Sequence, residues 1–184
     1  NKIILITGAS SGIGMAAAKA FAQKGARLIL TARRVELLKI LSKELEKGFG
    51  TRSVVLKLDV RKKQEVQKTI KKLPKDWQNI DILLNNAGLS RGLDRLHEGK
   101  VRDWEEMIDT NVKGLLYVSR EVIPLMTVRN KGHIINIGSI AGHEVYPKGN
   151  VYCASKHAVD AITKGMRIDL VDTNIRVTTI DPGL

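Results

Sequence analysis

The chain has 184 residues, and 43% of them are hydrophobic, which excludes a wholly disordered protein and is enough for one domain with a buried core. Its single cysteine, Cys153, excludes an intramolecular disulfide and a cysteine-rich zinc site. The formal charge of +12 opens nucleic-acid binding as a hypothesis, but aromatic residues, which stack on single-stranded bases, make up only 4% of the chain.

Apolar runs and helical patterns alternate along the whole chain. Continuous apolar runs, typical of buried parallel strands, predict strands over residues 2–7, 27–32, 53–58, 80–84, 133–138 and 175–180. Helical spacing of apolar residues predicts helices over residues 13–24, 34–47, 62–73, 101–128 and 151–171. Gly25, Gly48 and Pro74 follow the first three of these helices and are typical stop signals.

Helix-length segments separate the strands, so consecutive strands must be joined by crossovers. The sequence therefore predicts an α/β fold, a doubly wound parallel sheet with helices on both faces, in one domain over residues 1–184. Residues 89–100 are expected to form a loop. No apolar stretch approaches the roughly 20 residues of a membrane span, and the N-terminus has no signal-peptide pattern, so we expect a cytoplasmic protein without a membrane partner.

The basic residues are densest between Lys57 and Lys75. Most of this run lies on one predicted helix, for which a solvated basic face is a simpler interpretation than a nucleic-acid site. We therefore expect no nucleic-acid partner. Binding at low salt in a salt-dependent gel shift would contradict this expectation.

Three glycines, Gly8, Gly12 and Gly14, lie between the first strand and the first helix. In this position Gly8 can make a tight turn, Gly12 can let the backbone approach a pyrophosphate, and Gly14 can let the helix pack closely on the strand. The helix N-terminus offers free N–H groups to phosphate. The pattern indicates a dinucleotide site, with a purely structural turn as the alternative.

The end of the second strand selects between the two nicotinamide dinucleotides. A carboxylate there binds the ribose 2′-hydroxyl of NAD, whereas an arginine pairs with the 2′-phosphate of NADP. This sequence has Arg33 and Arg34 and no acid at that position, and Ser10 and Ser11 can add hydroxyl groups. We therefore predict NADP, with Arg33 as the first candidate and Arg34 as the second.

Tyr152 and Lys156 lie four residues apart in a predicted helix and so share one helical face. A nearby cation favours the phenolate form of a tyrosine, which can exchange a proton with a carbinol or carbonyl oxygen. The spacing alone is common and is more typical of an ordinary helix. Here, however, Ser139 ends the fifth strand and Asn86 follows the fourth, and ligands of open α/β sheets bind outside these strand ends.

Taken together, these motifs resemble the short-chain dehydrogenases/reductases. The resemblance covers the whole chain and rests on a set of motifs in the expected order: the turn Thr7–Gly14, Asp59, Asn85–Gly88, Asn111, Ser139, Tyr152, Lys156 and Pro182-Gly183. It implies a Rossmann sheet with strand order 3-2-1-4-5-6. It also implies a substrate-covering loop and a seventh edge strand after the sixth, so residues 1–184 are expected to be a domain truncated before that loop.

The resemblance also implies roles for individual residues. Ser139, Tyr152 and Lys156 are the expected catalytic triad, and Asn111 completes a tetrad, relaying protons through a water. Asp59 and Val60 are expected to face the adenine, and no metal is expected. The full set of expected cofactor-binding residues is Gly8, Ser10, Ser11, Gly12, Ile13, Gly14, Arg33, Arg34, Asp59, Val60, Asn86, Ala87, Gly88, Tyr152, Lys156, Pro182 and Gly183.

Within the family, the segments around Arg33, Asn111 and Ser139 are similar to the NADP-dependent 3-hydroxy acid dehydrogenases. The implied reaction is hydride transfer between the nicotinamide of NADP(H) and a 3-hydroxy acid such as serine, or 3-hydroxypropionate and malonic semialdehyde. Two alternatives stay open, a 3-oxoacyl-carrier-protein reductase or other short-chain reductase, and a non-catalytic NADP-binding sensor or scaffold. The resemblance further implies a homotetramer or homodimer.

Overall fold

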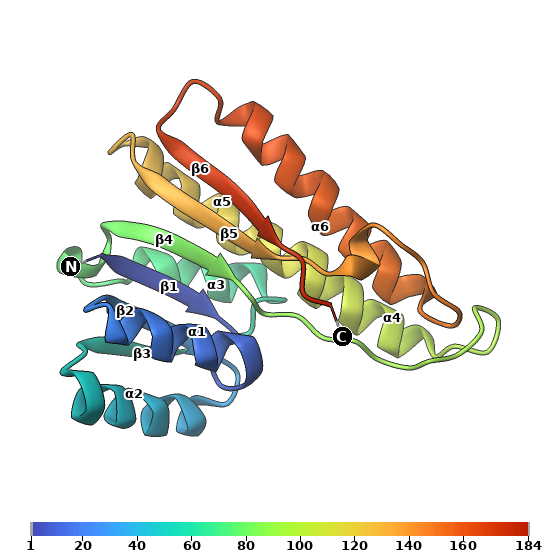
Figure 1. Cartoon of the computed structure of the whole chain (residues 1–184), viewed down its shortest axis with the longest axis horizontal. Coiled ribbons are helices and arrows are strands. Elements are labelled where there is room, and N and C mark those ends of the chain that lie inside the picture. The colour runs from blue at the N-terminus through green and yellow to red at the C-terminus, as the bar shows by residue number, and fades with distance from the viewer. Residues whose placement is uncertain (1, 184) are drawn as a thin grey trace.

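Six parallel strands form the centre of the computed structural model, which describes residues 2–183 (Figure 1). The strands are β1 (Ile3–Thr7), β2 (Arg27–Ala32), β3 (Ser53–Lys57), β4 (Ile80–Asn85), β5 (Gly132–Ile137) and β6 (Ile175–Ile180). Their order in the sheet is β3-β2-β1-β4-β5-β6, and all five neighbouring pairs are parallel, which confirms the predicted fold and strand order.

Helices connect the strands. They are α1 (Gly12–Gln23), α2 (Val35–Phe49), α3 (Lys63–Lys71), α4 (Val101–Ile108), α5 (Leu115–Thr127) and α6 (Asn150–Asp169). Short helical turns lie at η1 (Lys75–Trp77), η2 (Asp109–Gly114) and η3 (Ile140–Gly142). Residues 86–100 form the long irregular segment between β4 and α4, which confirms the expected loop.

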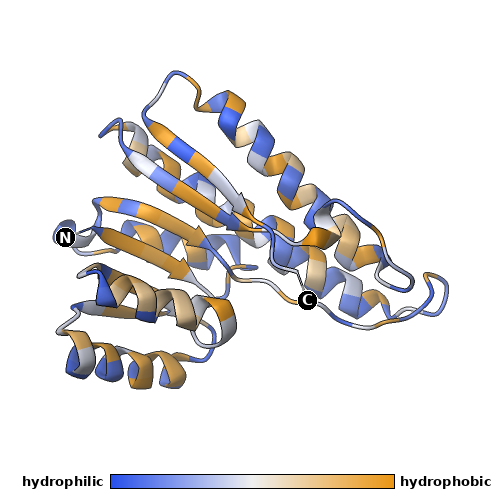
Figure 2. Cartoon of the chain, viewed as in Figure 1, coloured by the Kyte–Doolittle hydropathy of each residue, from blue (hydrophilic) through white to orange (hydrophobic). Residues whose placement is uncertain are grey.

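The apolar residues of the strands divide into two cores, one on each face of the sheet. Because side chains of a strand alternate between faces, Ile4 and Ile6 of β1 pack with α1 and α2, whereas Leu5 packs with α3, α5 and α6. Figure 2 shows β1 and β4 as largely apolar bands, β5 and β6 as strands with both polar and apolar residues, and the helices with alternating polar and apolar residues. The two cores hold the sheet rigid, so that its carboxyl edge can carry a site.

The predicted helix ends differ from the observed ones by up to two residues, and the second and fourth predicted helices show the causes. The second was expected to stop at Gly48, but α2 continues to Phe49, and Gly50, in the left-handed conformation with φ +63°, caps it instead. The long helix predicted over 101–128 is divided by η2, a π-helical turn. Gly114, the last residue of η2, packs so closely on Val60 that a Cβ there would lie 2.6 Å from Val60 Cγ2.

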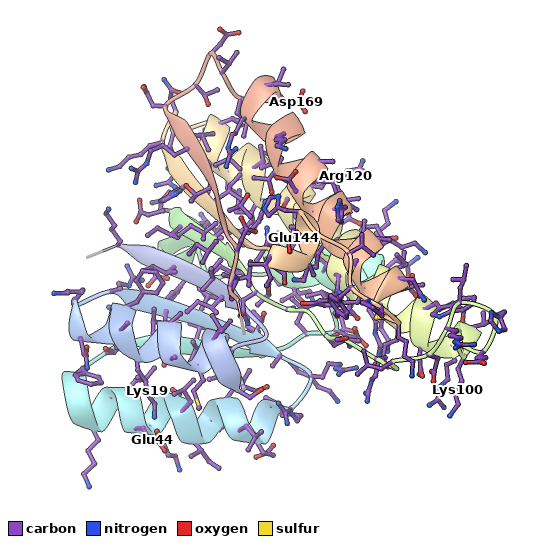
Figure 3. The ribbon with its side chains drawn as sticks, turned by 45° about the vertical axis from the view of Figure 1, so that its right-hand side comes forward. Lys19, Glu44, Lys100, Arg120, Glu144 and Asp169 are labelled. Atoms are coloured by element: carbon purple, nitrogen blue, oxygen red, sulfur yellow. The ribbon has the colours of Figure 1, made fainter. Side chains whose placement is uncertain are left out.

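Ion pairs lie along the surface of the domain. Lys19 of α1 and Glu44 of α2 lie 3.3 Å apart on the outside of that helix pair (Figure 3), an exposed contact that contributes at most about 1 kcal/mol. Strand β6 lies at the end of the sheet, and its last residue, Ile180, is about half exposed. Among the helices of residues 2–183, none is both long enough and apolar enough to cross a membrane.

Candidate active site

A cleft of about 1010 Å³ lies outside the carboxyl ends of the strands. This is the edge at which open parallel sheets bind their ligands. Almost all of the residues that the sequence predicted for the site line this cleft. The lining residues among them are Gly8, Ser10, Ser11, Gly12, Ile13, Arg33, Arg34, Asp59, Val60, Asn86, Ala87, Gly88, Ser139, Tyr152, Lys156, Pro182 and Gly183. The two that are not in the lining, Gly14 and Asn111, lie behind it.

The glycine turn forms one wall of the cleft. Gly8 and Gly12 have φ angles of +66° and +54°, in the left-handed region that side chains disfavour. A Cβ at Gly12 would meet nothing within 4 Å, so the backbone there borders open space in the cleft. The first turn of α1 follows directly, with its free N–H groups. The turn is therefore built to receive an anionic group such as a pyrophosphate.

Gly14 serves a different purpose, because it lets the turn pack against the loop after β4. A Cβ on Gly14 would overlap the side-chain amide of Asn86. That amide donates to the carbonyl oxygens of Thr7 (2.8 Å) and Gly8 (3.2 Å), and the Asn86 N–H donates to Thr7 Oγ1 at 3.0 Å. Asn86 thus fixes the turn in addition to lining the cleft.

Arg34 reaches across to the glycine turn. Its Nη2 donates to Ser11 Oγ at 2.8 Å and to Ser10 Oγ at 3.2 Å. The two serine hydroxyls and the guanidinium therefore gather at one place in the cleft wall, where they can bind a phosphate together.

Arg33 points toward α4, where it meets Glu106. Arg33 Nη1 lies 3.4 Å from Glu106 Oε1, and Arg61 Nη1 lies 3.4 Å from the same oxygen. Arg91 Nε contacts the other oxygen of Glu106 at 3.2 Å. One carboxylate therefore gathers three guanidinium groups, and Arg33 keeps donors available because its side chain is 52% exposed.

Asp59 holds Arg61 in the cleft wall. Arg61 Nε lies 2.9 Å from Asp59 Oδ1 and Arg61 Nη2 lies 2.7 Å from Asp59 Oδ2, a two-pronged pair. The hydrogen bonds from Arg61 lower the pKa of Asp59, so this carboxylate stays charged at neutral pH. The interpretation of the basic run as a solvated face is wrong for Arg61, which lines the cleft.

Tyr152 and Lys156 lie in the first two turns of α6, on the side facing the cleft. Lys156 is 7% exposed, its Nζ donates to the Ile137 carbonyl oxygen at 2.9 Å, and it lies 5.8 Å from the centre of the Tyr152 ring. Burial lowers the pKa of Lys156 to about 8, against a weaker opposing effect of Asp181. The Lys156 amine is therefore mostly protonated, as the ammonium, at neutral pH, and it lies close to the Tyr152 phenol.

Ser139 lies two residues after the end of β5 and lines the cleft. It is buried, and its Oγ accepts a hydrogen bond from the Ala141 N–H at 3.1 Å, capping η3. Because that bond uses an acceptor site of the oxygen, the hydroxyl hydrogen stays available to a ligand.

Asn111 occupies the π-helical turn η2, behind the cleft. Its Oδ1 accepts from the Leu89 N–H at 2.9 Å, and its Nδ2 donates to the Leu89 carbonyl oxygen (2.9 Å) and to Ser155 Oγ (3.0 Å). The amide therefore ties the loop after β4 to α6. π-Helical turns inside α-helices occur frequently at functional sites.

The chain is similar in sequence to one family of known enzymes. The family model for short chain dehydrogenases matches residues 2–184. The chain belongs to the short-chain dehydrogenase family. The NADP-dependent 3-hydroxy acid dehydrogenase YdfG of Escherichia coli (strain K12) is 48% identical over 182 residues, which are 99% of this chain and 72% of that protein. The NADP-dependent 3-hydroxy acid dehydrogenase of Schizosaccharomyces pombe is 44% identical over 184 residues, 100% of this chain and 71% of that protein.

Solved structures agree with this family membership. The closed form of serine dehydrogenase complexed with NADP+ superposes with a TM-score of 0.95 at 48% identity, covering 99% of this chain and 72% of that one. The serine dehydrogenase from Escherichia coli superposes with a TM-score of 0.94, covering 99% of this chain and 82% of that one.

Several residues of this short-chain dehydrogenase site were not predicted from the sequence. Arg61, Thr110 and Tyr146 line the cleft, and Glu106 binds Arg33 from outside it. Arg61 follows Asp59 by only two residues, a spacing that allows the two side chains to pair. Glu106 had no such signal, because it lies on α4 and its partners Arg33 and Arg61 follow β2 and β3, far away in the sequence. Among residues 2–183, no three His, Cys, Asp or Glu side chains gather closely enough to hold a metal ion.

Proposed function

We propose that this chain is an NADP(H)-dependent oxidoreductase that interconverts a secondary alcohol and a carbonyl compound, with a 3-hydroxy acid such as serine or 3-hydroxypropionate as the alcohol. The observation that carries the proposal is one cleft lined by both the glycine turn with Arg33 and the group Ser139, Tyr152 and Lys156. The 3-hydroxy acid as substrate is supported by the names of relatives at 44–48% identity.

The cleft fits the proposed cofactor. The open space beside Gly12, at the N-terminus of α1, suits the pyrophosphate. Arg33 and Arg34 offer guanidinium groups to the 2′-phosphate, and Asp59 and Val60 line the cleft beyond β3, where the adenine is proposed to lie. Pro182 and Gly183 line the other part of the cleft, with Ser139 and Tyr152.

When bound, NADP(H) supplies or accepts the hydride. In our proposal Tyr152 gives a proton to the carbonyl oxygen during reduction and removes it from the alcohol during oxidation. The Ser139 hydroxyl donates to the same oxygen and orients it. The buried charge of Lys156 favours the phenolate form of Tyr152. Asn111 holds Leu89 and Ser155 in place beside them, and its relay of protons through a water stays a prediction.

Two alternatives share much of this evidence. A 3-oxoacyl-carrier-protein reductase would use the same cofactor and proton chemistry on a larger substrate. A non-catalytic sensor would bind NADP(H) but would have no need for Ser139, Tyr152 and Lys156 in the same cleft.

A panel of 3-hydroxy acids and 3-oxo compounds, followed by the absorbance of NADPH, separates these functions. We expect turnover with serine or 3-hydroxypropionate in the presence of NADP+. Turnover of a 3-oxoacyl thioester alone supports the reductase alternative, and tight NADPH binding without turnover of any compound supports the sensor.

The charge of Lys156 gives the proposed reaction a pH dependence. Because burial brings the pKa of Lys156 to about 8, the ammonium is present below that pH and is lost above it. In the direction of carbonyl reduction we expect kcat/KM to fall above pH 8, by about tenfold per pH unit. In Lys156→Arg the charge persists to much higher pH, so the decline is expected to move upward, at a lower maximal rate.

Lys164→Arg is the matched control, since Lys164 lies on the same helix, is 63% exposed and pairs with Asp160. Its pH profile is expected to follow that of the unmodified chain. A decline of Lys156→Arg at the same pH as the unmodified chain would contradict the role of Lys156.

We also propose that the protein forms a homotetramer or homodimer and works in the cytoplasm. Of the apolar residues of α5, Leu115, Val118 and Val122 are buried in the chain's own core, whereas Leu116 is 41% exposed and could contact a second subunit. The single free cysteine suits a reducing compartment. Light scattering coupled to size-exclusion chromatography measures the oligomeric state.

A further inference from the structure

The segment after β6 is closely bound to the turn that carries Ser139. The Ser139 N–H donates to Asp181 Oδ1 at 3.1 Å. On either side of that contact, the Gly138 N–H donates to the Ile180 carbonyl oxygen (2.8 Å) and the Ile140 N–H donates to the Pro182 carbonyl oxygen (3.2 Å). Three successive N–H groups of the turn are therefore satisfied by residues 180–182, and the central one is satisfied by a charged side chain.

The turn is shaped around that carboxylate. A Cβ at Gly138 would overlap Asp181 Oδ1, so the absence of a side chain at this position makes room for the charged oxygen. The other oxygen, Asp181 Oδ2, lies 3.3 Å from His143 Nε2, in the loop after η3. Asp181 is thus held on both oxygens, and its side chain is only 29% exposed.

The contact that holds Lys156 is one residue away from Gly138, against which the same carboxylate packs. The ammonium is bonded to the carbonyl oxygen of Ile137, the residue immediately before Gly138, and is otherwise poorly solvated. Burial lowers the pKa of Lys156, and the negative charge of Asp181 acts in the opposite direction. Without Asp181, the charged form of Lys156 loses part of its stabilisation.

Other charges around α6 are directed elsewhere. Tyr152, one turn before Lys156 on α6, is the proposed proton donor, and His143 contacts the Oδ2 atom of Asp181. Four acids of α6, α4 and η2 have basic partners of their own: Asp160 pairs with Lys164, Asp103 with Arg102, Glu106 with Arg61 and Asp109 with Lys113. On β6, Arg176 contacts His133.

We propose that Asp181 is a positioning residue of the reaction, whose carboxylate fixes the backbone of Ser139 and supplies the negative charge that balances the Lys156 ammonium. This inference rests on the proposed function. In this inference Asp181 contacts neither the substrate nor the cofactor, and it acts through Ser139 and Lys156.

Two variants separate the two parts of the role. Asp181→Asn keeps an amide oxygen that can accept from the Ser139 N–H, but it removes the charge. Asp181→Ala removes both the acceptor and the charge, and we expect its kcat to fall at least about tenfold below that of Asp181→Asn, since a buried N–H then loses its partner. Asp169→Asn is the matched control, because it removes an equivalent charge from the exposed far end of α6 (Figure 3).

The decisive measurement is the titration of Lys156 in the cofactor-free full chain, followed by NMR with 13C-labelled lysine, with Lys156→Arg to assign the signal. The midpoint in the unmodified chain is expected near pH 8. In Asp181→Asn it is expected to fall by about half a pH unit or more, whereas Asp169→Asn leaves it in place. The alkaline decline of kcat/KM is expected to move by the same amount.

An unchanged midpoint in a folded Asp181→Asn variant overturns the inference. A structural role alone would lower kcat without moving either the titration or the pH profile, and that result also overturns it. Because the titration needs no turnover, its outcome is independent of the proposed function. If the unmodified chain shows no NADPH-dependent turnover but the Lys156 midpoint shifts in Asp181→Asn, the proposed function is overturned. The electrostatic effect of Asp181 on Lys156 is then still supported.

Discussion

Tyr152→Phe is expected to abolish turnover of the 3-hydroxy acid while leaving NADPH binding largely intact. The phenol oxygen is the only atom removed, and in the proposed reaction it carries the proton to and from the substrate oxygen. Loss of such a proton donor reduces kcat by about 10²–10⁴-fold. Phenylalanine fills the same space, so the cleft and α6 are expected to keep their shape. Steady-state kinetics and NADPH titration by calorimetry measure the two properties separately.

Tyr117→Phe is the matched control for this variant. Tyr117 lies on α5, packs against the core and is not in the cleft lining, so removing its hydroxyl tests the loss of a phenol oxygen elsewhere in the chain. Its kcat is expected to stay within about twofold of the unmodified chain, because surface and peripheral substitutions rarely matter. Appreciable residual turnover in Tyr152→Phe would reject Tyr152 as the proton donor.

The fold could be predicted from the sequence because each element carries a strong local signal. The strands are uninterrupted apolar runs, such as Ile3–Thr7, and each predicted strand starts and ends within one residue of the observed one. The helix ends were less predictable. Gly48 lies inside α2, because the helix continues to Phe49 and ends at Gly50, which takes the left-handed capping conformation. A glycine near the end of a helical pattern therefore does not by itself fix the last helical residue.

The site was predictable where chemistry is tied to strand ends. Gly12, Ser139 and Tyr152 were expected in one cleft because the carboxyl ends of parallel strands meet at one edge, and they line that cleft. Glu106 and Asp181 could not be predicted in this way. Each of them acts through a contact between elements that are far apart in the sequence. A single acid in a helix or after a strand does not indicate which residue it will contact in the folded chain.

The charge of the chain also gains a more specific meaning. Of the many basic residues, Arg33, Arg34 and Arg61 gather in the cleft wall. Arg61 pairs with two acids, Asp59 and Glu106. This local excess of positive charge suits an anion with several charges, such as a phosphorylated dinucleotide. The exposed lysines of α3 contribute to the total but not to this site.

Arg33→Ala is expected to weaken binding of NADP far more than binding of NAD. Only NADP carries the 2′-phosphate, and an arginine–phosphate hydrogen bond is worth about 1.5–3 kcal/mol, so the dissociation constant for NADP is expected to rise about 10- to 100-fold. The dissociation constant for NAD is expected to change little. Isothermal titration of the two dinucleotides with the same protein preparation measures the difference.

Two further variants give this prediction its controls. Arg102→Ala removes the same charge from an 89% exposed arginine of α4 and is expected to leave both dissociation constants unchanged. Arg34→Ala is expected to weaken NADP less than Arg33→Ala, because Arg34 already shares its donors with Ser10 and Ser11, whereas Arg33 keeps donors free beside Glu106. An equal loss of NADP and NAD in Arg33→Ala would mean that this arginine shapes the cleft and does not select the 2′-phosphate.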